Sequence, residues 1–344
     1  MSRSIVLSNG ELCVALDHNG LVRDLYYPHV GLEDHVRGHY IHRIGVHVEG
    51  RLSWLGEDEW RIEVGSEKES LATKITARNE RMQVELLFHD VVYNERPIFL
   101  RKILIKNLAK DAREIKIYIA HQFEIFKSHG GETAYYDPVS HCIIHYKGRR
   151  VFLMSAMLDA ELFSDFAIGI ANFQGHEGTH KDAEDGALSQ NAIEHGPVDS
   201  ILGMYASFAG GQARTAYYWM AAAQSVPESH ALNEYCRTKT PEHLVRTATD
   251  YWKAWTNAYQ WSFYGMSEEH VTLFKRSLLC VRAHVDVEGG ILASVDSDML
   301  QYGLDTYSYV WPRDGAYAAM ALDQAGDSNV ARSFFEFCKS VISP

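Results

Sequence analysis

Two stretches, Ile98–Asn107 (IFLRKILIKN) and Glu114–Phe123 (EIKIYIAHQF), alternate apolar with charged or polar side chains. Successive side chains of a β-strand point to opposite faces, so this period of two predicts antiparallel strands with one buried and one solvated face. The same period, interrupted by turn residues at short intervals, runs from the start of the chain to about residue 225. It predicts a large, double-layered antiparallel β-sandwich.

Tight turns join the predicted strands. Asn19-Gly20 separates Leu12–Leu16 from Leu21–Tyr26, and both residue types tolerate the positive φ angles of a hairpin turn. Tyr135–Pro138 (YYDP) is also predicted to form a turn. The other strands predicted from alternation are Ile44–Val48, Leu52–Leu55, Leu71–Ala77, Met82–Phe88, Cys142–Tyr146 and Val151–Met154.

The segment Phe173–Ser200 is polar and rich in glycine, which predicts a long loop. Long loops in compact domains are often functional, but an ordinary surface excursion is an equal alternative. Asp182, Glu184 and Asp185 lie close together in this segment. We interpret them as a solvated acidic cluster, with a loop that reaches a binding site as the second alternative.

The period becomes helical near residue 240. Thr240 can cap a helix that has Pro241 at its first position. Further helices are predicted after Ser267, over Gly315–Ala325, and after Asp327 or Ser328. The first helix places Leu244, Ala248, Tyr251, Trp252, Trp255 and Tyr259 on one apolar face. Such wide apolar faces cannot be buried on each other alone, so we expect these helices to pack on the sandwich or on helices beyond this sequence.

Length and composition restrict the class of protein. A chain of 344 residues is long enough for two domains, or for one complete domain and part of another. Lys and Arg total 33 against 45 Asp and Glu, and the net charge of −12 argues against nucleic acid or an anionic membrane as a partner. Such acidity is compatible with a neutral sugar substrate, although it also occurs in proteins whose charge serves only solubility.

The cysteine usage and the N-terminus predict a cytoplasmic protein. The five cysteines have neither metal-binding spacing nor a disulfide pattern, so we expect free thiols in a reducing compartment. The apolar run at the N-terminus is too short for a signal peptide, and no later stretch reaches membrane-spanning length. The cysteines are Cys13, Cys142, Cys236, Cys280 and Cys338.

The sequence predicts no metal site and no cofactor. His141 and His145 fall in a strand-like stretch, where a spacing of four residues separates them by about 13 Å, too far to share an ion. Gly210-Gly211 and Gly289-Gly290 lack the spacing and the Lys or Ser of a phosphate-binding loop.

The segment Tyr307–Gly315 (YSYVWPRDG) combines three large aromatic rings, an arginine and an aspartate before a predicted helix. Sugars bind through such a set, because rings stack on the pyranose face and charged groups hydrogen-bond the hydroxyls. A purely structural interpretation is equally open from the chemistry alone. In that interpretation Asp314 caps the helix, Arg313 pairs with a core carboxylate, and the rings fill space.

The segment Trp311–Gly315, with Tyr307 and Tyr309 before it, resembles the first substrate-binding motif of the glucoamylase-like glycoside hydrolases of family 15. Further stretches, in the same order as in the bacterial and archaeal branch of that family, extend the resemblance over essentially the whole chain. They are Tyr135–Pro138, His145–Gly148, Asp182–Gly186, His195–Ser200 and Gly289–Ser294.

The resemblance implies a β-supersandwich over residues 1–239, a helical linker over 240–265, and the start of an (α/α)6 barrel over 266–344. It implies that Arg313 and Asp314 bind hydroxyls of a terminal glucose and that Tyr307 and Trp311 shape the pocket wall. The family inverts the anomeric centre with two glutamates, which is consistent with the carboxyl separation that inversion requires. By the resemblance, both glutamates lie after Pro344, so no residue here is assigned a catalytic role and we expect this chain to be inactive alone.

Several functions remain open at this level. The leading interpretation is a glucoamylase that releases terminal α-linked glucose from an oligosaccharide, and an α,α-trehalase that takes a disaccharide is the nearest alternative in the same family. A binding module without catalysis is disfavoured, because the last predicted helix carries an apolar face that needs a cover. A disaccharide phosphorylase fits the motif Trp311–Gly315 less well than a hydrolase does. The sequence makes no prediction of the oligomeric state.

Overall fold

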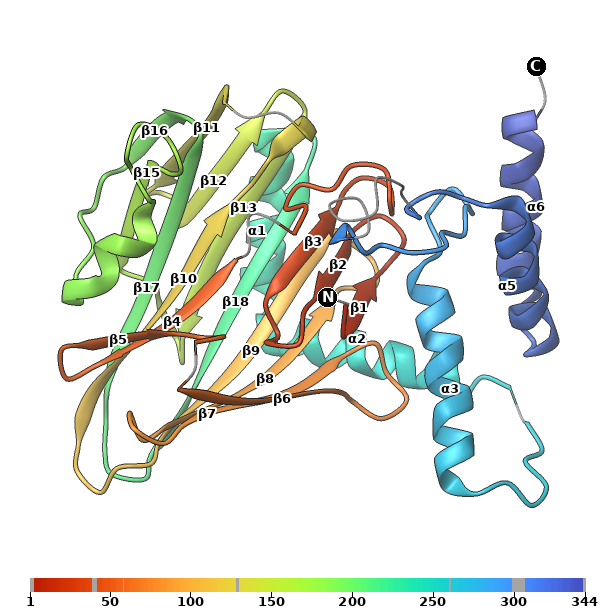
Figure 1. Ribbon diagram of the computed structural model, residues 1–344, viewed down its shortest axis with the longest axis horizontal. Helices are drawn as coiled ribbons and strands as arrows, with labels where there is room; N and C mark the ends of the chain where they lie inside the picture. Colours follow the sequence, from red (N-terminus) through yellow and green to blue (C-terminus); the bar gives the residue numbers. More distant parts are fainter. Residues whose placement is uncertain are drawn as a thin grey trace.

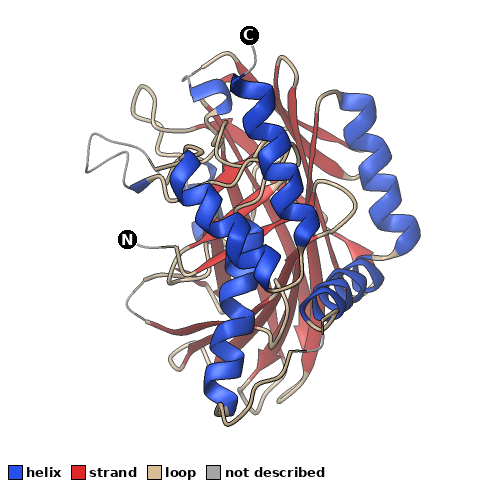
Figure 2. Cartoon of the chain, turned by 90° about the vertical axis from the view of Figure 1, so that its right-hand side faces the viewer, coloured by secondary structure: helices blue, strands red, loops and turns tan. Residues whose placement is uncertain are grey.

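Antiparallel sheets form most of the molecule, and helices lie along one side of them and at one end (Figures 1 and 2). The computed structural model describes residues 3–38, 42–57, 59–127, 130–259, 261–298 and 307–342. Every strand pair recorded within these residues is antiparallel.

Over the residues that the structure describes, the strands form sheets of three, five and ten strands. The three-stranded sheet contains β1 (Ile5–Ser8), β2 (Cys13–Leu16) and β3 (Val22–Tyr26). The five-stranded sheet has the order β15 (Asp165–Ile170), β17 (Val198–Phe208), β10 (Arg113–Gln122), β4 (Arg43–Val48) and β5 (Arg51–Trp54). The ten-stranded sheet has the order β16 (Ile193–Gly196), β11 (Glu132–Asp137), β12 (Cys142–Lys147), β13 (Arg150–Leu158), β18 (Ala213–Ala223), β9 (Ile98–Asn107), β8 (Val84–Val92), β7 (Thr73–Asn79) and β6 (Trp60–Ser66), with β14 (Glu161–Leu162) paired to β13.

The main core lies between the ten-stranded sheet and the two smaller sheets. Ile103 and Ile105 of β9 and Ile115 and Ile117 of β10 are buried there, which confirms the alternation predicted for both stretches. The prediction of one solvated face is wrong for the first half of β9. Ile98 is buried on the outer face of the sheet as well, because helices pack there.

Two helices cover that outer face. They are α1 (Val226–Lys239) and α2 (Pro241–Thr256), which lie behind the ten-stranded sheet in the view of Figure 1. The predicted start of α2 is confirmed, because the Thr240 hydroxyl accepts a hydrogen bond from the His243 amide and Pro241 is the first helical residue. Tyr251 and Tyr259 were predicted on its buried face, but their side chains are exposed. The buried stripe of α2 is therefore narrower than the sequence suggested.

The segment Phe173–Ser200 covers the outer face of the five-stranded sheet. It contains a short 3-10 helix, η2 (Thr179–Asp185), and ends in β16 and the start of β17, so the prediction of a continuous loop is wrong after residue 192. Ala183 and Leu188 pack against Trp54 and Tyr118. This segment lies at the left of Figure 1, at the opposite end from the last helices, so it does not reach toward them.

Two smaller predictions also require correction. The first three residues of Tyr135–Pro138 belong to β11, and the turn begins at Pro138. His141 lies in this turn with a positive φ of 47°, whereas His145 is buried in β12 beside the Ser200 hydroxyl. The two histidines therefore do not share a strand. A second short 3-10 helix, η1 (Ile125–Lys127), precedes β11.

The remaining helices are α3 (Glu268–Ala283), α5 (Pro312–Gln324) and α6 (Ser328–Ile342). They share a third core, in which Leu278, Leu322 and Phe334 are buried. Helix α3 is capped by Ser267, as predicted, and packs against β1, whereas α5 and α6 stand side by side at the right of Figure 1. Helix α6 begins at Ser328, directly after Asp327, which agrees with the first of the two predicted starts.

The described residues contain no helix that is long and apolar enough to cross a bilayer. All five cysteines are free thiols, as predicted, and Cys13, Cys142 and Cys236 are buried.

Candidate functional site

The predicted sugar-binding segment lies where the chain enters α5. Residues 307–309 run beside residues 293–294, because the Ala293 amide donates to the Tyr309 carbonyl (3.3 Å) and the Ser294 amide donates to the Tyr307 carbonyl (3.2 Å). These backbone hydrogen bonds hold the segment as an extended edge. Val310 then turns inward against Gly290 and joins the core of α3, α5 and α6.

A loop of the three-stranded sheet supports this edge from below. The buried carboxylate of Asp286 accepts a hydrogen bond from the Val30 amide at 2.8 Å, and a side chain at Gly31 would collide with Leu292. Val287 donates its amide to the Gly10 carbonyl at 2.9 Å. The candidate site therefore lies where the three-stranded sheet contacts the segment that follows α3.

A buried cluster of charged side chains also joins the three-stranded sheet to the segment that follows α3. The Arg3 guanidinium pairs with Asp24 of β3 and donates to Asp298 at 2.9 Å, and its side chain is only 2% exposed. Burial by itself would raise the pKa of Asp298, but the hydrogen bond and positive charge of Arg3, with a smaller effect of the charge of Arg23, outweigh burial and lower the pKa to about 2. Asp298 is therefore charged at neutral pH, and its ion pair with Arg3 anchors the chain to the sheet ahead of the segment Tyr307–Gly315.

The aromatic side chains of the segment face outward. Tyr307, Tyr309 and Trp311 are 45%, 58% and 40% exposed, which is unusual for three large rings so close together. The ring centroids of Tyr307 and Trp311 are 6.4 Å apart, with an angle of 41° between the planes. The structure therefore brings these two predicted residues together as a tilted pair that is open to solvent.

Arg313 and Asp314 form the second predicted pair. The guanidinium and the carboxylate of these neighbouring residues contact each other at 3.4 Å, and both side chains are exposed. The structural interpretation in which Arg313 pairs with a core carboxylate is therefore wrong. Asp314 does not cap the helix either, because α5 begins at Pro312, with Trp311 at the cap position and Asp314 in the first turn. A carboxylate there is favoured by the partial positive charge of the helix N-terminus.

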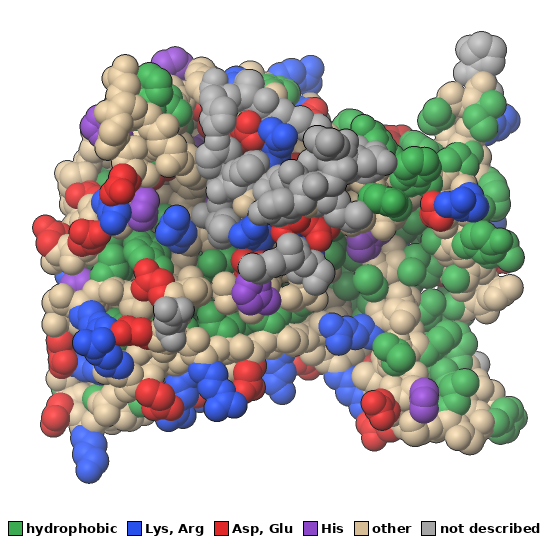
Figure 3. All heavy atoms as spheres, viewed as in Figure 1, with side chains coloured by type: hydrophobic (Ala, Val, Ile, Leu, Met, Phe, Trp, Pro, Cys, Tyr) green, Lys and Arg blue, Asp and Glu red, His purple; other side chains and the backbone are tan. Residues whose placement is uncertain are grey.

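Exposed apolar side chains continue from this segment over the last helices. Tyr317 and Met320 of α5 and Phe335 of α6 are exposed, and Figure 3 shows hydrophobic side chains gathered over α3, α5 and α6. The segment therefore lies at the border of a broad apolar surface.

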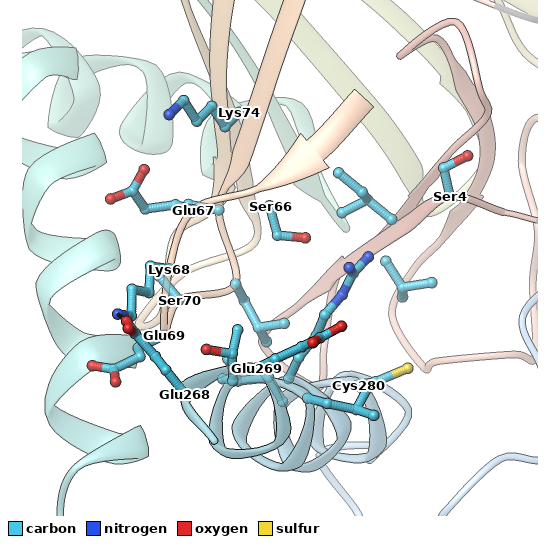
Figure 4. Close-up of a pocket in the computed structure, with 18 residues that line it drawn as sticks. Ser4, Ser66, Glu67, Lys68, Glu69, Ser70, Lys74, Glu268, Glu269 and Cys280 are labelled. Atoms are coloured by element: carbon cyan, nitrogen blue, oxygen red, sulfur yellow. Dashed lines mark hydrogen bonds and ion pairs between the residues drawn. The ribbon is translucent and has the colours of Figure 1, made fainter. Parts of the chain in front are cut away.

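A separate groove of about 820 Å³ lies between β1, the turn that joins β6 to β7, and α3 (Figure 4). Some of its charged residues form ion pairs across the groove or beside it: Lys68 contacts Glu268 at 2.8 Å, and Glu67 contacts Lys253 of α2 at 3.3 Å. None of the residues that line the groove belongs to the segment 307–315. We assign these ion pairs to the contact of the sheets with α2 and α3.

Sequence reasoning missed the residues that support the site. Asp286, Val30 and Arg3 contact groups that are up to 295 residues away along the chain. Only the turn residues Gly289-Gly290, which follow Asp286, signal a bend in the sequence. The four side chains predicted to bind sugar form two exposed pairs, which can offer a stacking surface and directional hydrogen bonds.

Comparisons with known proteins define the fold. No protein-family model matches the chain. An uncharacterised glycosyl hydrolase of Methanocaldococcus jannaschii is 22% identical over 348 residues, covering 98% of this chain and 53% of the relative. A bacterial glucoamylase solved in complex with acarbose superposes with a TM-score of 0.79 and 16% identity, over 99% of this chain and 50% of the glucoamylase.

These likenesses identify the fold as that of a glycoside hydrolase. The sheets and helices of this chain correspond to about half of a bacterial glucoamylase, and the chain also spans about half the length of the curated relative.

Proposed function

We propose that this chain is part of a glycosidase of the glucoamylase type, which releases terminal α-linked glucose from glucans with inversion. The proposal rests on the likeness to a glucoamylase over 99% of the chain. In this proposal residues 1–239, which contain the sheets and α1, form the supersandwich domain. Residues 240–265 form the helical linker, and α3, α5 and α6 begin an (α/α)6 barrel.

The exposed pairs before α5 would form part of the sugar-binding pocket. Tyr307 and Trp311 present ring faces against which a pyranose can stack. Arg313 and Asp314 offer a donor fork and an acceptor for adjacent sugar hydroxyls, at the cost of weakening their exposed contact with each other. That contact holds the two groups near each other before a ligand arrives.

The catalytic carboxyl groups are proposed to lie after Pro344. Inversion requires two carboxyl groups about 6.5–9.5 Å apart, and one of them must be able to donate a proton. The carboxylates that precede the site are engaged in structural contacts. Asp286 holds the Val30 amide, and Asp296 and Asp298 contact Arg3. This engagement favours a binding role, rather than a catalytic one, for the described part of the site.

Calorimetric titration of the chain with acarbose tests the proposal, because acarbose is the ligand of the structurally similar glucoamylase. We expect binding that weakens at least tenfold in Trp311→Ala. The matched control is Tyr264→Ala, which removes a ring that is 93% exposed between α2 and α3. Equal affinities of the two variants, or no binding by the unmodified chain, would contradict the proposal.

Comparison of maltose with trehalose in the same titration distinguishes the two activities of the resembling family. Tighter binding of trehalose would favour the α,α-trehalase alternative. We expect no glucose release from either sugar by this chain, and measurable turnover would show that the catalytic groups lie within residues 1–344.

A further inference from the structure

Three metal-binding side chains converge where helix α1 meets the hairpin of β11 and β12. Asp137 is the last residue of β11, and Cys142 is the first residue of β12 and lies directly opposite it in the strand register. His230 projects from α1 toward them. One ligand atom from each residue lies within 4.8 Å of the other two.

The spacing fits a metal ion better than a hydrogen bond. His230 Nε2 and Asp137 Oδ2 are 3.6 Å apart, which exceeds ordinary hydrogen-bonding distance. Around a tetrahedral zinc ion, with bonds of about 2.0–2.3 Å, neighbouring ligand atoms are separated by about 3.3–3.8 Å. The imidazole and the carboxylate thus already stand at nearly the separation that coordination requires.

Hydrogen bonds from the turn that follows β11, donated by Val139 and Ser140, hold the Asp137 carboxylate in place. Asp137 uses its other oxygen, Oδ1, to accept the Val139 amide at 2.9 Å, which fixes the carboxylate plane. The Nδ1 atom of His230 is buried, and no hydrogen bond to it is found among the described residues. Cys142 faces α1 on the outer side of the ten-stranded sheet and is fully buried.

We propose that Asp137, Cys142 and His230 form a binding site for a divalent zinc-type metal ion that fastens α1 to the β11–β12 hairpin. Thiolate, imidazole and carboxylate are the ligands that zinc prefers in proteins. Binding displaces the thiol proton of Cys142 to solvent, so the thiolate and the carboxylate together balance the charge of the ion. The side chains of Asp137 and His230 are 18% and 31% exposed, which leaves room for a water molecule as the fourth ligand.

The hairpin and the helix already have one contact at this place. Asn233 of α1 donates its amide to the carbonyl of Ser140, in the turn between Asp137 and Cys142, at 3.2 Å. The ion would therefore find its ligands held close together before it binds. This inference is independent of the proposed sugar-binding function.

Titration of the untagged, chelator-treated chain with Co²⁺ tests the site. We expect one equivalent of Co²⁺ to produce a sulfur-to-cobalt charge-transfer absorption that Zn²⁺ then abolishes by displacement. His230→Gln should weaken Co²⁺ binding at least tenfold. Because the His230 side chain is 31% exposed, we expect this variant to keep the buried thiol and the fold. Cys142→Ser should abolish the absorption.

Two matched variants serve as controls. Cys236→Ser removes a buried thiol that lies on α1 but outside the proposed site. His243→Gln removes a histidine on α2. Both should keep the stoichiometry and the absorption. The proposal is overturned if the charge-transfer absorption is missing at one equivalent, if it persists in Cys142→Ser, or if His230→Gln binds Co²⁺ as tightly as the unmodified chain.

Discussion

The substitution Gly315→Ala should destabilise the protein when residue 334 is phenylalanine and stabilise it in the background of Phe334→Leu. Gly315 lies in the first turn of α5, where a Cβ atom would stand 2.4 and 2.5 Å from Cε2 and Cζ of Phe334 in α6. Ordinary carbon contacts are about 3.5–4.0 Å, so the ring would have to move by about 1 Å. Phe334 is only 1% exposed, so its ring can move only by displacing the side chains packed around it.

Two opposing effects set the magnitude. Overpacking a core costs about 1–3 kcal/mol, whereas replacing glycine by alanine within a helix stabilises the helix by about 1 kcal/mol. We therefore expect Gly315→Ala to reduce the free energy of unfolding by about 1 kcal/mol and to lower the Tm by about 1–2 °C.

The substitution Phe334→Leu removes the ring atoms at 2.4 and 2.5 Å, and the next atom of that side chain, Cδ2, lies at an acceptable 3.5 Å. In this background the clash disappears and the helix propensity of alanine remains. Gly315→Ala should then raise the Tm relative to Phe334→Leu alone. Thermal unfolding followed by far-UV circular dichroism measures all four proteins, and an equal loss of Tm in both backgrounds would refute the packing argument.

Two further predictions concern buried charges in the sheets. Asp90→Asn should lower the free energy of unfolding by about 3–5 kcal/mol in urea titrations, because it breaks a doubly hydrogen-bonded pair with Arg101 whose side chains are 0% and 4% exposed. Glu80→Gln, which breaks an exposed contact with Arg78, should cost less than about 1 kcal/mol, and similar losses in both variants would be inconsistent with this reasoning. Burial raises the pKa of Glu132 from 4.5 to about 8, so the protein should lose stability as the pH rises through this window, because the folded state resists ionisation. Thermal unfolding across that range should show a smaller loss in Glu132→Gln, and parallel curves for the two proteins would contradict the assigned burial.

Local signals in the sequence predicted the starts of α2 and α3 correctly, whereas α5 begins at Pro312, three residues before its predicted start at Gly315. Thr240 and Ser267 each accept a hydrogen bond from an amide three residues further along, so the residues that determine the helix start are all neighbours in the chain. Helix α1 was missed because its buried side includes Ser229 and Asn233. Asn233 is buried there because it accepts a hydrogen bond from the indole of Trp219 at 2.8 Å, and such a partner cannot be recognised from helical periodicity.

The candidate site shows the same division between local and distant information. Tyr307 and Trp311 are four residues apart, and their grouping with Arg313 and Asp314 is visible in the sequence. The contact of Asp286 with Val30 spans 256 residues and depends on how the sheets meet the helices. Composition and periodicity do not indicate which parts of the sheets and helices come into contact. The sequence therefore predicted the residues of the candidate site but not the contacts, such as that of Asp286 with Val30, that hold the neighbouring chain in place.

The burial of Arg3 has a consequence for the order in which the protein is assembled on the ribosome. One of its partners, Asp298, is 295 residues further along the chain, and at about 5–20 residues per second the ribosome needs roughly 15–60 s to supply it. During this interval the Arg3 guanidinium can pair with Asp24 but not yet with Asp298. The ion pair between Arg3 and Asp298 therefore forms late in synthesis, after all the strands of the sheets have been made.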